Sequence, residues 1–233
     1  MKYSSIKEAT FIKRPNRFIA HVNLNGQEEI VHVKNTGRCK EILKEGVTVL
    51  LEKAKNKNRK TKYSLIAAYK NDILINIDSQ VPNQVVFEAL KAGKIKEVGD
   101  LQEIKREVSY ANSRFDIYFK KKIKNVIKEG FIEVKGVTLE KDGKTMFPDA
   151  PTKRGTRHIL EMIEAVKEGY QGYIFFLIQL KGVNLFTPNT IMDPEFAAAL
   201  KLANQEGVNI LAYDSQIKEN SIIIDKKLPI LLT

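Results

Sequence analysis

The sequence contains no tryptophan and one cysteine, Cys39, in 233 residues. A lone cysteine cannot form a disulfide within the chain, which excludes the class of small secreted domains held together by disulfides. Long apolar runs are also absent: nothing approaches the roughly 18–20 residues that a membrane span needs. Residues 1–15 lack the apolar stretch of a secretory signal. We therefore expect a cytoplasmic protein with no membrane partner.

Charge and apolar residues are both plentiful. Hydrophobic residues make up 43% of the chain, enough to bury a core. The 39 Lys and Arg outnumber the 28 Asp and Glu, which gives a net charge of +11. Residues 1–80 hold 16 basic and 8 acidic residues (+8), and residues 81–233 hold 23 and 20 (+3). Most of the excess positive charge thus lies in the first third of the chain.

Two basic clusters stand out within this distribution, at residues 53–62 and 120–124. Either cluster can be a solvated loop that keeps the protein soluble. Alternatively, lysine and arginine bind a polyanion with little sequence preference, because each phosphate contact releases a counterion. No basic amphipathic helix with a large apolar face accompanies them, so nucleic acid is favoured over an anionic membrane.

Residues 1–80 are predicted to form about five short strands. Residues 18–24 alternate in polarity, and Asn25-Gly26 is typical of a type I′ hairpin turn. We expect one short helix at 38–45, ended by Gly46, between the third and fourth strands. This order is typical of an OB-fold-like β-barrel, which binds single strands on its open face and loops.

Residues 81–233 show a different pattern, predicted as α-β-β-β-α-β and then α-β-β. A helix begins at Pro82 and stops before Gly93, and the strongest helix covers 156–169. Residues 173–180 are almost entirely apolar, as in a central strand buried on both faces. We expect an irregular loop at 140–155, and Asp193 as the N-cap of a further helix. The predicted fold class is α+β, with a barrel domain at 1–80 and an α/β domain with a mixed central sheet at 81–233.

Three charged residues interrupt the strands of this second domain: Asp116, Glu133 and Lys135. Glu133 and Lys135 share one face of their strand because side chains alternate. If the two strands form a hairpin, Asp116 lies beside Glu133, and two carboxylates with a backbone carbonyl suit Mg²⁺ or Mn²⁺. Lys135 is then placed to orient water or to stabilise charge on a phosphate.

The same trio allows two other interpretations. An E-x-K pattern alone is more often a salt-bridge cluster on a solvent face. A glycosidase pair of carboxylates leaves Lys135 and the positive charge unexplained, and sugar sites usually use aromatics, whereas this chain has no tryptophan. The order of a helix, a hairpin with Asp and E-x-K, a helix and a buried strand is instead the layout of the PD-(D/E)xK nuclease core.

The chain also resembles the sugar fermentation stimulation protein family, SfsA. The resemblance rests on segments in order along nearly the whole chain: FIKRPNRFIAHV, VHVKNTGRCKEIL, YANSRFDIYF, FIEVKGVTLE, FPDAPTKRGTRHILEM and DPEFAAALKLANQEGVNILAY. It implies an OB-like domain followed by a PD-(D/E)xK domain, DNA binding, and a nuclease site that matches Asp116, Glu133 and Lys135. It also implies a role in regulating sugar (maltose) metabolism genes.

Further residues are assigned around this centre. Glu88 and Gln179 are additional candidates for the catalytic site, against the alternatives of a surface acid and a strand-end amide. Asp149, in a literal Pro-Asp pair, follows the E-x-K and is assigned to a loop. His158 is a candidate general base, although a histidine that caps a helix or packs against its neighbours is more common. The predicted phosphate contacts are the following basic residues: Arg17, Lys34, Arg38, Lys57, Arg59, Lys60, Arg114, Lys121, Lys122 and Arg157.

The sequence thus supports two hypotheses about function. The first is a nucleic-acid-binding protein, with DNA favoured and RNA open, whose Mg²⁺- or Mn²⁺-dependent centre hydrolyses phosphodiesters through Asp116, Glu133 and Lys135. The second is a DNA-binding transcriptional regulator of sugar fermentation genes that has the same fold but performs no turnover. Strand preference, direction of cleavage and oligomeric state stay open, with the apolar C-terminal segment a candidate homodimer interface.

Overall fold

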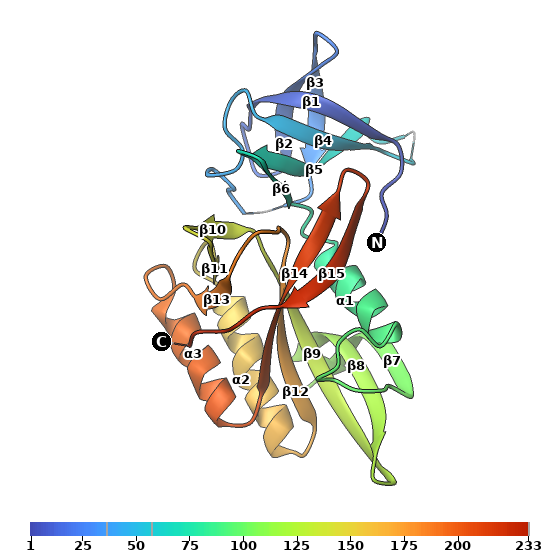
Figure 1. Ribbon diagram of the computed structural model, residues 1–233, viewed down its shortest axis with the longest axis vertical. Helices are drawn as coiled ribbons and strands as arrows, with labels where there is room; N and C mark the ends of the chain where they lie inside the picture. Colours follow the sequence, from blue (N-terminus) through green and yellow to red (C-terminus); the bar gives the residue numbers. More distant parts are fainter. Residues whose placement is uncertain (36, 57, 233) are drawn as a thin grey trace.

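The computed structural model describes residues 1–35, 37–56 and 58–232. Six strands come first (Figure 1): β1 Ile6–Lys13, β2 Ile19–Leu24, β3 Gln27–Val33, β4 Thr48–Lys53, β5 Tyr63–Lys70 and β6 Ile73–Asn76. They pair in the order β3-β2-β1-β4-β5-β6, and a parallel pairing of β3 with β5 closes five of them into a barrel. The predicted OB-like barrel is confirmed.

The turn between β2 and β3 shows how local sequence shapes this barrel. Asn25 and Gly26 have φ angles of 54° and 83°, and Leu24 pairs with Gln27 across them. Positive φ at both central residues is what a type I′ turn requires. On β3, Val31 and Val33 point into the barrel and are buried, as the alternation of polarity predicts.

The helix predicted at 38–45 is wrong, because the described residues of this segment form turns. Cys39 adopts a φ of 49°, in the left-handed region, so a right-handed helix cannot run through it. The Arg14 guanidinium donates to four backbone carbonyls, those of Arg17, Asn35, Gly37 and Arg38, at 2.6–2.8 Å. These bonds hold the loop before the segment, and within the segment the Leu43 N–H still donates to the Cys39 carbonyl at 2.8 Å as a single turn.

The rest of the chain forms a mixed sheet of six strands: β7 Glu103–Tyr110, β8 Ser113–Ile123, β9 Val126–Val137, β12 Gln171–Ile178, β14 Asn209–Lys218 and β15 Ser221–Lys227. Their spatial order is β15-β14-β12-β9-β8-β7. β12 is parallel to both of its neighbours, β9 and β14, whereas the other pairs are antiparallel. Strand β12 is apolar and almost wholly buried, as the sequence predicted for a central strand.

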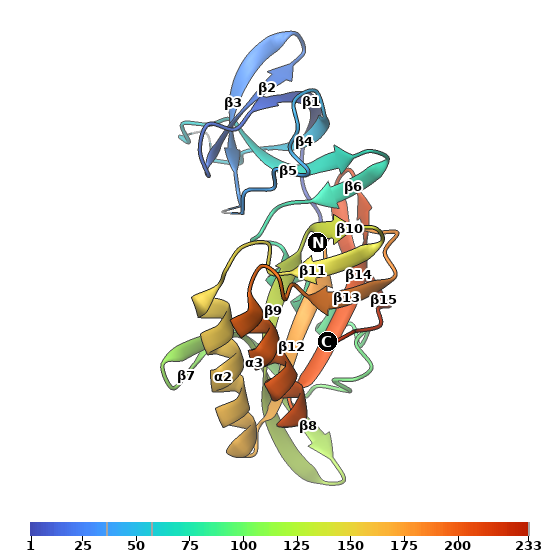
Figure 2. The same ribbon diagram turned by 90° about the vertical axis from the view of Figure 1, so that its left-hand side faces the viewer.

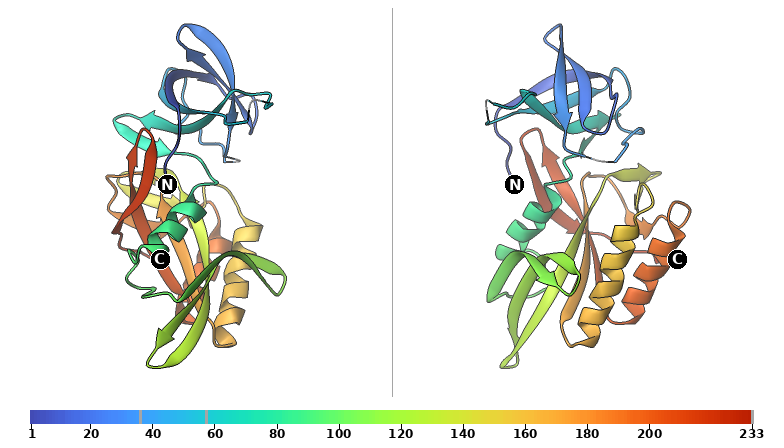
Figure 3. Two further views of the ribbon diagram at one scale, coloured as in Figure 1. Left: turned by 90° about the vertical axis from the view of Figure 1, so that its right-hand side faces the viewer. Right: turned by 180° about the vertical axis from the view of Figure 1, so that it is seen from behind.

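Helices cover both faces of this sheet. Helix α1, Pro82–Lys91, lies on one face, and helices α2, Lys153–Lys167, and α3, Pro194–Gln205, lie together on the other (Figures 2 and 3). The buried stripe of α2 includes Ile159, Met162 and Ile163. Asp193 caps α3 by accepting from the Phe196 N–H at 2.9 Å, as predicted. None of the described helices is both long and apolar enough to cross a bilayer.

The loop predicted at 140–155 is more regular than expected. Strands β10, Leu139–Lys141, and β11, Lys144–Phe147, form a hairpin there. Its turn residues Asp142 and Gly143 both have positive φ, as in a type I′ turn. β11 also pairs in parallel with β13, Leu185–Pro188, in a separate three-stranded sheet. Three-residue and four-residue strands are too short to leave a clear alternation in the sequence.

The first residues of the chain cross from the barrel to the mixed sheet. The Tyr3 N–H donates to the Asn220 carbonyl at 2.8 Å, and Lys2 forms a bridge pairing with Ser221. The Met1 ammonium donates to the Ile222 carbonyl at 3.1 Å. The N-terminal segment is thereby built into the edge of the second domain, next to β15 (Figure 1).

Candidate active site

Asp116 and Glu133 lie side by side where strands β8 and β9 begin to separate. The antiparallel pairing of β8 and β9 runs from the hairpin turn up to Ile117 opposite Ile132. Asp116 and Glu133 are the next residues on the two strands. At this point Asp116 Oδ2 accepts a hydrogen bond from the backbone N–H of Val134 at 2.8 Å, in place of a further pairing between the strands. The hairpin register predicted from the sequence thus brings both carboxylates to one place.

The hydrogen bonds that Glu133 accepts from the described residues all go to one of its two carboxylate oxygens. Its Oε1 accepts hydrogen bonds from Lys135 Nζ at 2.6 Å and from His158 Nδ1 at 2.5 Å. Its Oε2 is buried and has no hydrogen-bond partner among the described residues. Burial alone would raise the pKa of Glu133, but the donors His158 and Lys135 hold that pKa below its usual range. Glu133 is therefore an ionised carboxylate with one oxygen still available.

The pKa of Asp116 is shifted in the opposite direction to that of Glu133. Burial raises the pKa of Asp116 to about 6, and the negative charge of Glu133 adds to this increase. The N–H of Val134, the ammonium of Lys135 and the side-chain amide of Asn83 oppose it; Asn83 Nδ2 donates to Asp116 Oδ1 at 2.6 Å. Asn83 was not predicted from the sequence, because its contact with Asp116 forms only when helix α1 packs on the sheet.

His158 connects helix α2 to this pair of strands. Its side chain is buried, and its ring meets the Phe115 ring edge-on at 6.4 Å between centroids. Its Nδ1 lies 2.5 Å from Glu133 Oε1, and Arg154 Nε donates to its Nε2 at 3.4 Å. The helix start is fixed by Thr152, whose hydroxyl accepts from the Gly155 N–H at 3.0 Å. His158 is therefore a positioning residue for Glu133.

The donor set at this point fits a hard divalent cation. Mg²⁺ binds through one or two carboxylates and keeps several waters. Asp116 and Glu133 supply two carboxylates, and the buried, unpartnered Oε2 of Glu133 is the kind of atom that a cation satisfies. Within residues 1–35, 37–56 and 58–232, no group of three or more His, Cys, Asp or Glu side chains is arranged to hold a metal. The fit is to a cation that shares its coordination with water.

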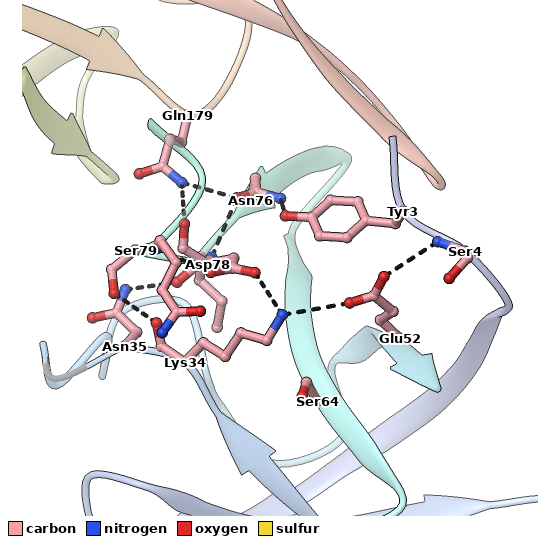
Figure 4. Close-up of polar contacts among 12 residues, drawn as sticks. Tyr3, Ser4, Lys34, Asn35, Glu52, Ser64, Asn76, Asp78, Ser79 and Gln179 are labelled. Carbon is pink, nitrogen blue, oxygen red and sulfur yellow. Dashed lines mark hydrogen bonds and ion pairs between the residues drawn. The ribbon is translucent and has the colours of Figure 1, made fainter. Parts of the chain in front are cut away.

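Glu88 and Gln179, the other two catalytic candidates, have different surroundings. Glu88 lies half-exposed on α1 and pairs with the Met1 ammonium at 2.7 Å. Gln179 is buried, and its amide donates to Asn76 Oδ1 at 2.8 Å and to the Asp78 carbonyl at 3.2 Å (Figure 4). The contacts of both side chains are thus with parts of the molecule other than Asp116 and Glu133.

Several predicted phosphate contacts are engaged inside the protein. Lys34 pairs with Asp78 at 3.1 Å and with Glu52 at 3.4 Å, at the junction of the two domains (Figure 4). Lys121 is buried and donates to the Val98 carbonyl at 2.7 Å.

The other basic candidates are at or near the surface. Arg59 donates to Ser64 and Thr61, and Arg114 pairs with Glu107 at 2.5 Å. Lys57 lies outside the described residues. The remaining candidates are all exposed: Arg17, Arg38, Lys60, Lys122 and Arg157.

Arg17 and Arg38 face a cleft between the domains. The cavity has a volume of about 670 Å³, and its other side is formed by the loop before α2, including Asp149 and Pro151. Asp149 lies in this loop, as predicted, and its carboxylate approaches Gly37 so closely that a Cβ built there would lie 2.7 Å from Oδ2. The two arginines thus stand on the barrel side of the interdomain cleft.

Comparison with known proteins assigns the chain to a family. A family model described as the "SfsA N-terminal OB domain" matches residues 12–77, and the "Sugar fermentation stimulation protein RE domain" matches residues 80–221. The chain belongs to the sugar fermentation stimulation protein family. A family member of Alkaliphilus oremlandii is 55% identical over 231 residues, covering 99% of this chain and 98% of that protein. One from Clostridium perfringens is 54% identical over the full length of both.

A solved structure of the family has the same fold. It is described as Pyrococcus furiosus SfsA in complex with Ca²⁺, and it matches with a TM-score of 0.85 at 28% sequence identity. The match covers 99% of this chain and 98% of that one. Barrel and mixed sheet therefore occur together in a distant member of the family.

Proposed function

We propose that this protein binds nucleic acid and hydrolyses phosphodiesters with a divalent cation at Asp116 and Glu133. The observation that carries the proposal is the geometry of Glu133. Two donors fix its Oε1, while its buried Oε2 has no partner within the described part of the chain. An ionised oxygen left unpaired in the interior is costly unless a ligand satisfies it.

Each side chain of the trio has a defined task in this proposal. Asp116 and Glu133 hold the cation, which supplies Lewis-acid stabilisation of a phosphate oxygen when bound. The Lys135 ammonium, only partly buried and 2.6 Å from Glu133, donates hydrogen bonds to the negative charge that develops on the phosphate. His158 and Lys135 together keep Glu133 ionised, so that it is ready to bind a cation at neutral pH.

Two further observations support a cation and a polyanion. The related Pyrococcus furiosus protein is described in complex with Ca²⁺, a hard cation that prefers oxygen ligands as Mg²⁺ does. In this chain, the first 80 residues carry most of the net charge of +11. Exposed Arg17 and Arg38 on the cleft are suited to phosphate contacts.

A second candidate is a DNA-binding regulator of sugar fermentation genes that performs no turnover. It is favoured by the state of Asp116, since both of its oxygens already accept hydrogen bonds, from Asn83 and from Val134. The names of the relatives refer to stimulation of sugar fermentation. This candidate predicts salt-sensitive DNA binding that a chelator does not change, with no cleavage.

The test uses the full chain with single- and double-stranded DNA and RNA, each with Mg²⁺, with Mn²⁺ and with a chelator. Cleavage of at least one substrate should require the cation and should fall about 100-fold or more in Lys135→Ala. Lys144→Ala, at an exposed lysine of the β10–β11 hairpin, is the control and should cleave like the wild type. If the wild type and Lys135→Ala behave alike on all four substrates, the catalytic part of the proposal fails.

A further inference from the structure

The β8–β9 hairpin extends beyond the sheet as a two-stranded arm. β7 pairs with β8 as far as Lys120, and β12 pairs with β9 from Gly130 onward. Residues 121–129 therefore form a ribbon, called the arm below, whose two outer edges pair with no strand of the described chain. The arm projects past the end of the sheet at the bottom of Figures 1 and 2.

The arm is a well-defined element. Its turn, Lys124-Asn125, has φ angles of 45° and 67° and follows the last pair, Ile123 opposite Val126, as in a type I′ hairpin. Its base is tied down by the Lys121 bond to the Val98 carbonyl and by the pair of Lys120 with Glu129 at 2.9 Å. These contacts matter because an isolated two-stranded ribbon is only marginally stable in water.

Exposed apolar and basic side chains lie close together around the tip of the arm. Ile123, Val126 and Ile127 are 40%, 54% and 60% exposed, which is unusual for β-branched aliphatic residues. Lys122, Lys124 and Lys128 flank them, and within the described part of the chain no carboxylate lies within 4.0 Å of these three lysines. The arm holds four lysines and one glutamate, a net charge of +3.

We propose that the arm inserts into a groove of a nucleic-acid duplex. The major groove of B-DNA is about 12 Å wide and admits a two-stranded β-ribbon. In that position the lysines meet phosphates along the groove walls and release counterions, while the isoleucine and valine side chains contact base edges such as thymine methyl groups. The inference rests on the proposed function in requiring nucleic acid as the ligand, and it adds that the ligand is double-stranded.

The distance from the arm to the candidate active site agrees with this ligand. Lys124, in the turn that follows β8, lies eight residues beyond Asp116, which is about 27 Å at roughly 3.4 Å per residue. One turn of B-DNA is about 34–36 Å long. A duplex with a phosphate at Asp116 therefore reaches the tip of the arm within one helical turn, provided that it follows β8.

A second copy of the chain is a less suitable partner for the arm. Free ribbon edges can pair with one another, but lysines on such edges oppose pairing through charge repulsion. In a symmetric contact between two arms, both surfaces would carry Lys122, Lys124 and Lys128, so like charges would be brought together. The same three charges are complementary to phosphate.

Fluorescence anisotropy with the full chain in chelator tests the arm without cleavage. The probes are a labelled 20-base-pair duplex and one of its strands alone. The variant Lys122→Ala/Lys124→Ala is compared with Lys141→Ala/Lys144→Ala, which removes two exposed lysines from the β10–β11 hairpin. The arm variant should bind the duplex about 10-fold more weakly, with a salt slope smaller by about two. Its single-strand affinity and the duplex affinity of the control should change less than about 2-fold.

A second variant separates apolar contact from charge. Ile127→Ser should weaken duplex binding several-fold and leave the salt slope unchanged, because no lysine is removed. Equal losses in the arm variant and the control, or equal losses on duplex and single strand, would overturn the proposal. A wild-type dimer in sedimentation that Ile127→Ser dissociates, with duplex binding intact, would show that the arm contacts a second copy instead.

The proposal for the arm and the proposal for the candidate active site can be refuted independently of each other. Lys122→Ala/Lys124→Ala leaves Asp116, Glu133 and Lys135 in place, so duplex binding in chelator and cleavage with the cation are measured independently. If the wild type never cleaves but the arm variant loses duplex binding, the arm proposal stands and the catalytic proposal falls. If no duplex binds at any salt concentration, the arm proposal falls.

Discussion

His158 Nδ1 lies 2.5 Å from Glu133 Oε1, and this bond connects helix α2 to strand β9. With Lys135 on the same oxygen, it determines which way the Glu133 carboxylate is turned. The free oxygen, Oε2, is then oriented by two residues on different elements. The geometry of the candidate cation site thus depends on the packing of α2 against the sheet.

The first prediction concerns His158 itself. His158→Ala should weaken the binding of Mn²⁺ by about 10- to 100-fold, as is usual when the partner of a metal-binding carboxylate is lost. Mn²⁺ binding to the full chain is measured by electron paramagnetic resonance or calorimetry, without any nucleic acid. His158→Asn retains a side-chain donor and should recover part of the affinity. Equal Mn²⁺ affinities in wild type and His158→Ala would refute the positioning role.

The second prediction is that the two carboxylates affect stability with opposite sign. The pKa of Asp116 is raised from 3.8 to about 6, so the folded state loses stability as pH rises through that range. In chelator at pH 8, Asp116→Asn should raise the free energy of unfolding by roughly 1–3 kcal/mol. This gain should vanish near pH 4, where the folded wild type is already protonated at Asp116.

Glu133→Gln provides the counterpart. The pKa of Glu133 is lowered, so its charge stabilises the fold above its usual pKa, and this contribution is lost as pH falls through the lowered value. The variant should be less stable than the wild type at pH 8 by about 1–3 kcal/mol. Denaturant titrations at pH 8 and pH 4 decide both points, and the same sign for the two variants at pH 8 would count against this account of the site.

The third prediction concerns Gly136, next to Lys135 on β9. A Cβ built on Gly136 would lie 2.4 Å from Gln179 Oε1 and 2.7 Å from Pro82 Cγ. Gly136→Ala should therefore destabilise the protein by about 1–3 kcal/mol through overpacking.

A double-variant cycle identifies the clashing group. Gln179→Ala loses the bonds to Asn76 and Asp78, but in the double variant it also removes the amide that clashes with the methyl group introduced by Gly136→Ala. The combined loss should therefore be smaller than the sum by at least about 0.5 kcal/mol. Strict additivity would show that Pro82, and not Gln179, sets the cost.

The fourth prediction tests an ion pair that joins the barrel to the β10–β11 hairpin. Lys70 Nζ lies 2.6 Å from Glu140 Oε2, and Lys70 together with the Gly143 N–H lowers the pKa of Glu140. Glu140→Gln should cost about 1 kcal/mol at pH 7, and the difference should shrink below pH 4.5 as wild-type Glu140 becomes protonated. The control is Glu107→Gln at an exposed pair with Arg114, where we expect less than about 0.5 kcal/mol. Equal effects at the two sites would contradict the argument from burial.

The convergence of Asp116, Glu133 and Lys135 could be predicted because it depends on local patterns. Two alternating strands joined by a short basic turn leave few registers that bury the apolar face. His158 and Asn83 come from helices on opposite faces of the sheet, and their contacts depend on tertiary packing. No spacing in the sequence relates them to Glu133 or Asp116.

The predictions that fail also have local causes. At 38–45, the pattern of apolar residues is helical, but Arg14 binds the carbonyls of the preceding loop and Cys39 takes a positive φ. Lys121 lies in a run of lysines that looks uniformly solvated, but the Val98 carbonyl accepts its ammonium inside the protein. In both cases a contact with a residue far away in the sequence accompanies the difference, and composition does not indicate such contacts.

The position of the first residues affects the order in which the protein can assemble during synthesis. Met1 and Ile222, which are joined by a hydrogen bond, lie 221 positions apart in the chain. Domains generally fold as they leave the ribosome, N-terminal part first, so the barrel strands can pair while the mixed sheet is still incomplete. Residues 1–3 cannot take up their positions until β15, far later in the chain, has been synthesised. The contacts between the N-terminal segment and β15 therefore form only after most of the mixed sheet is available.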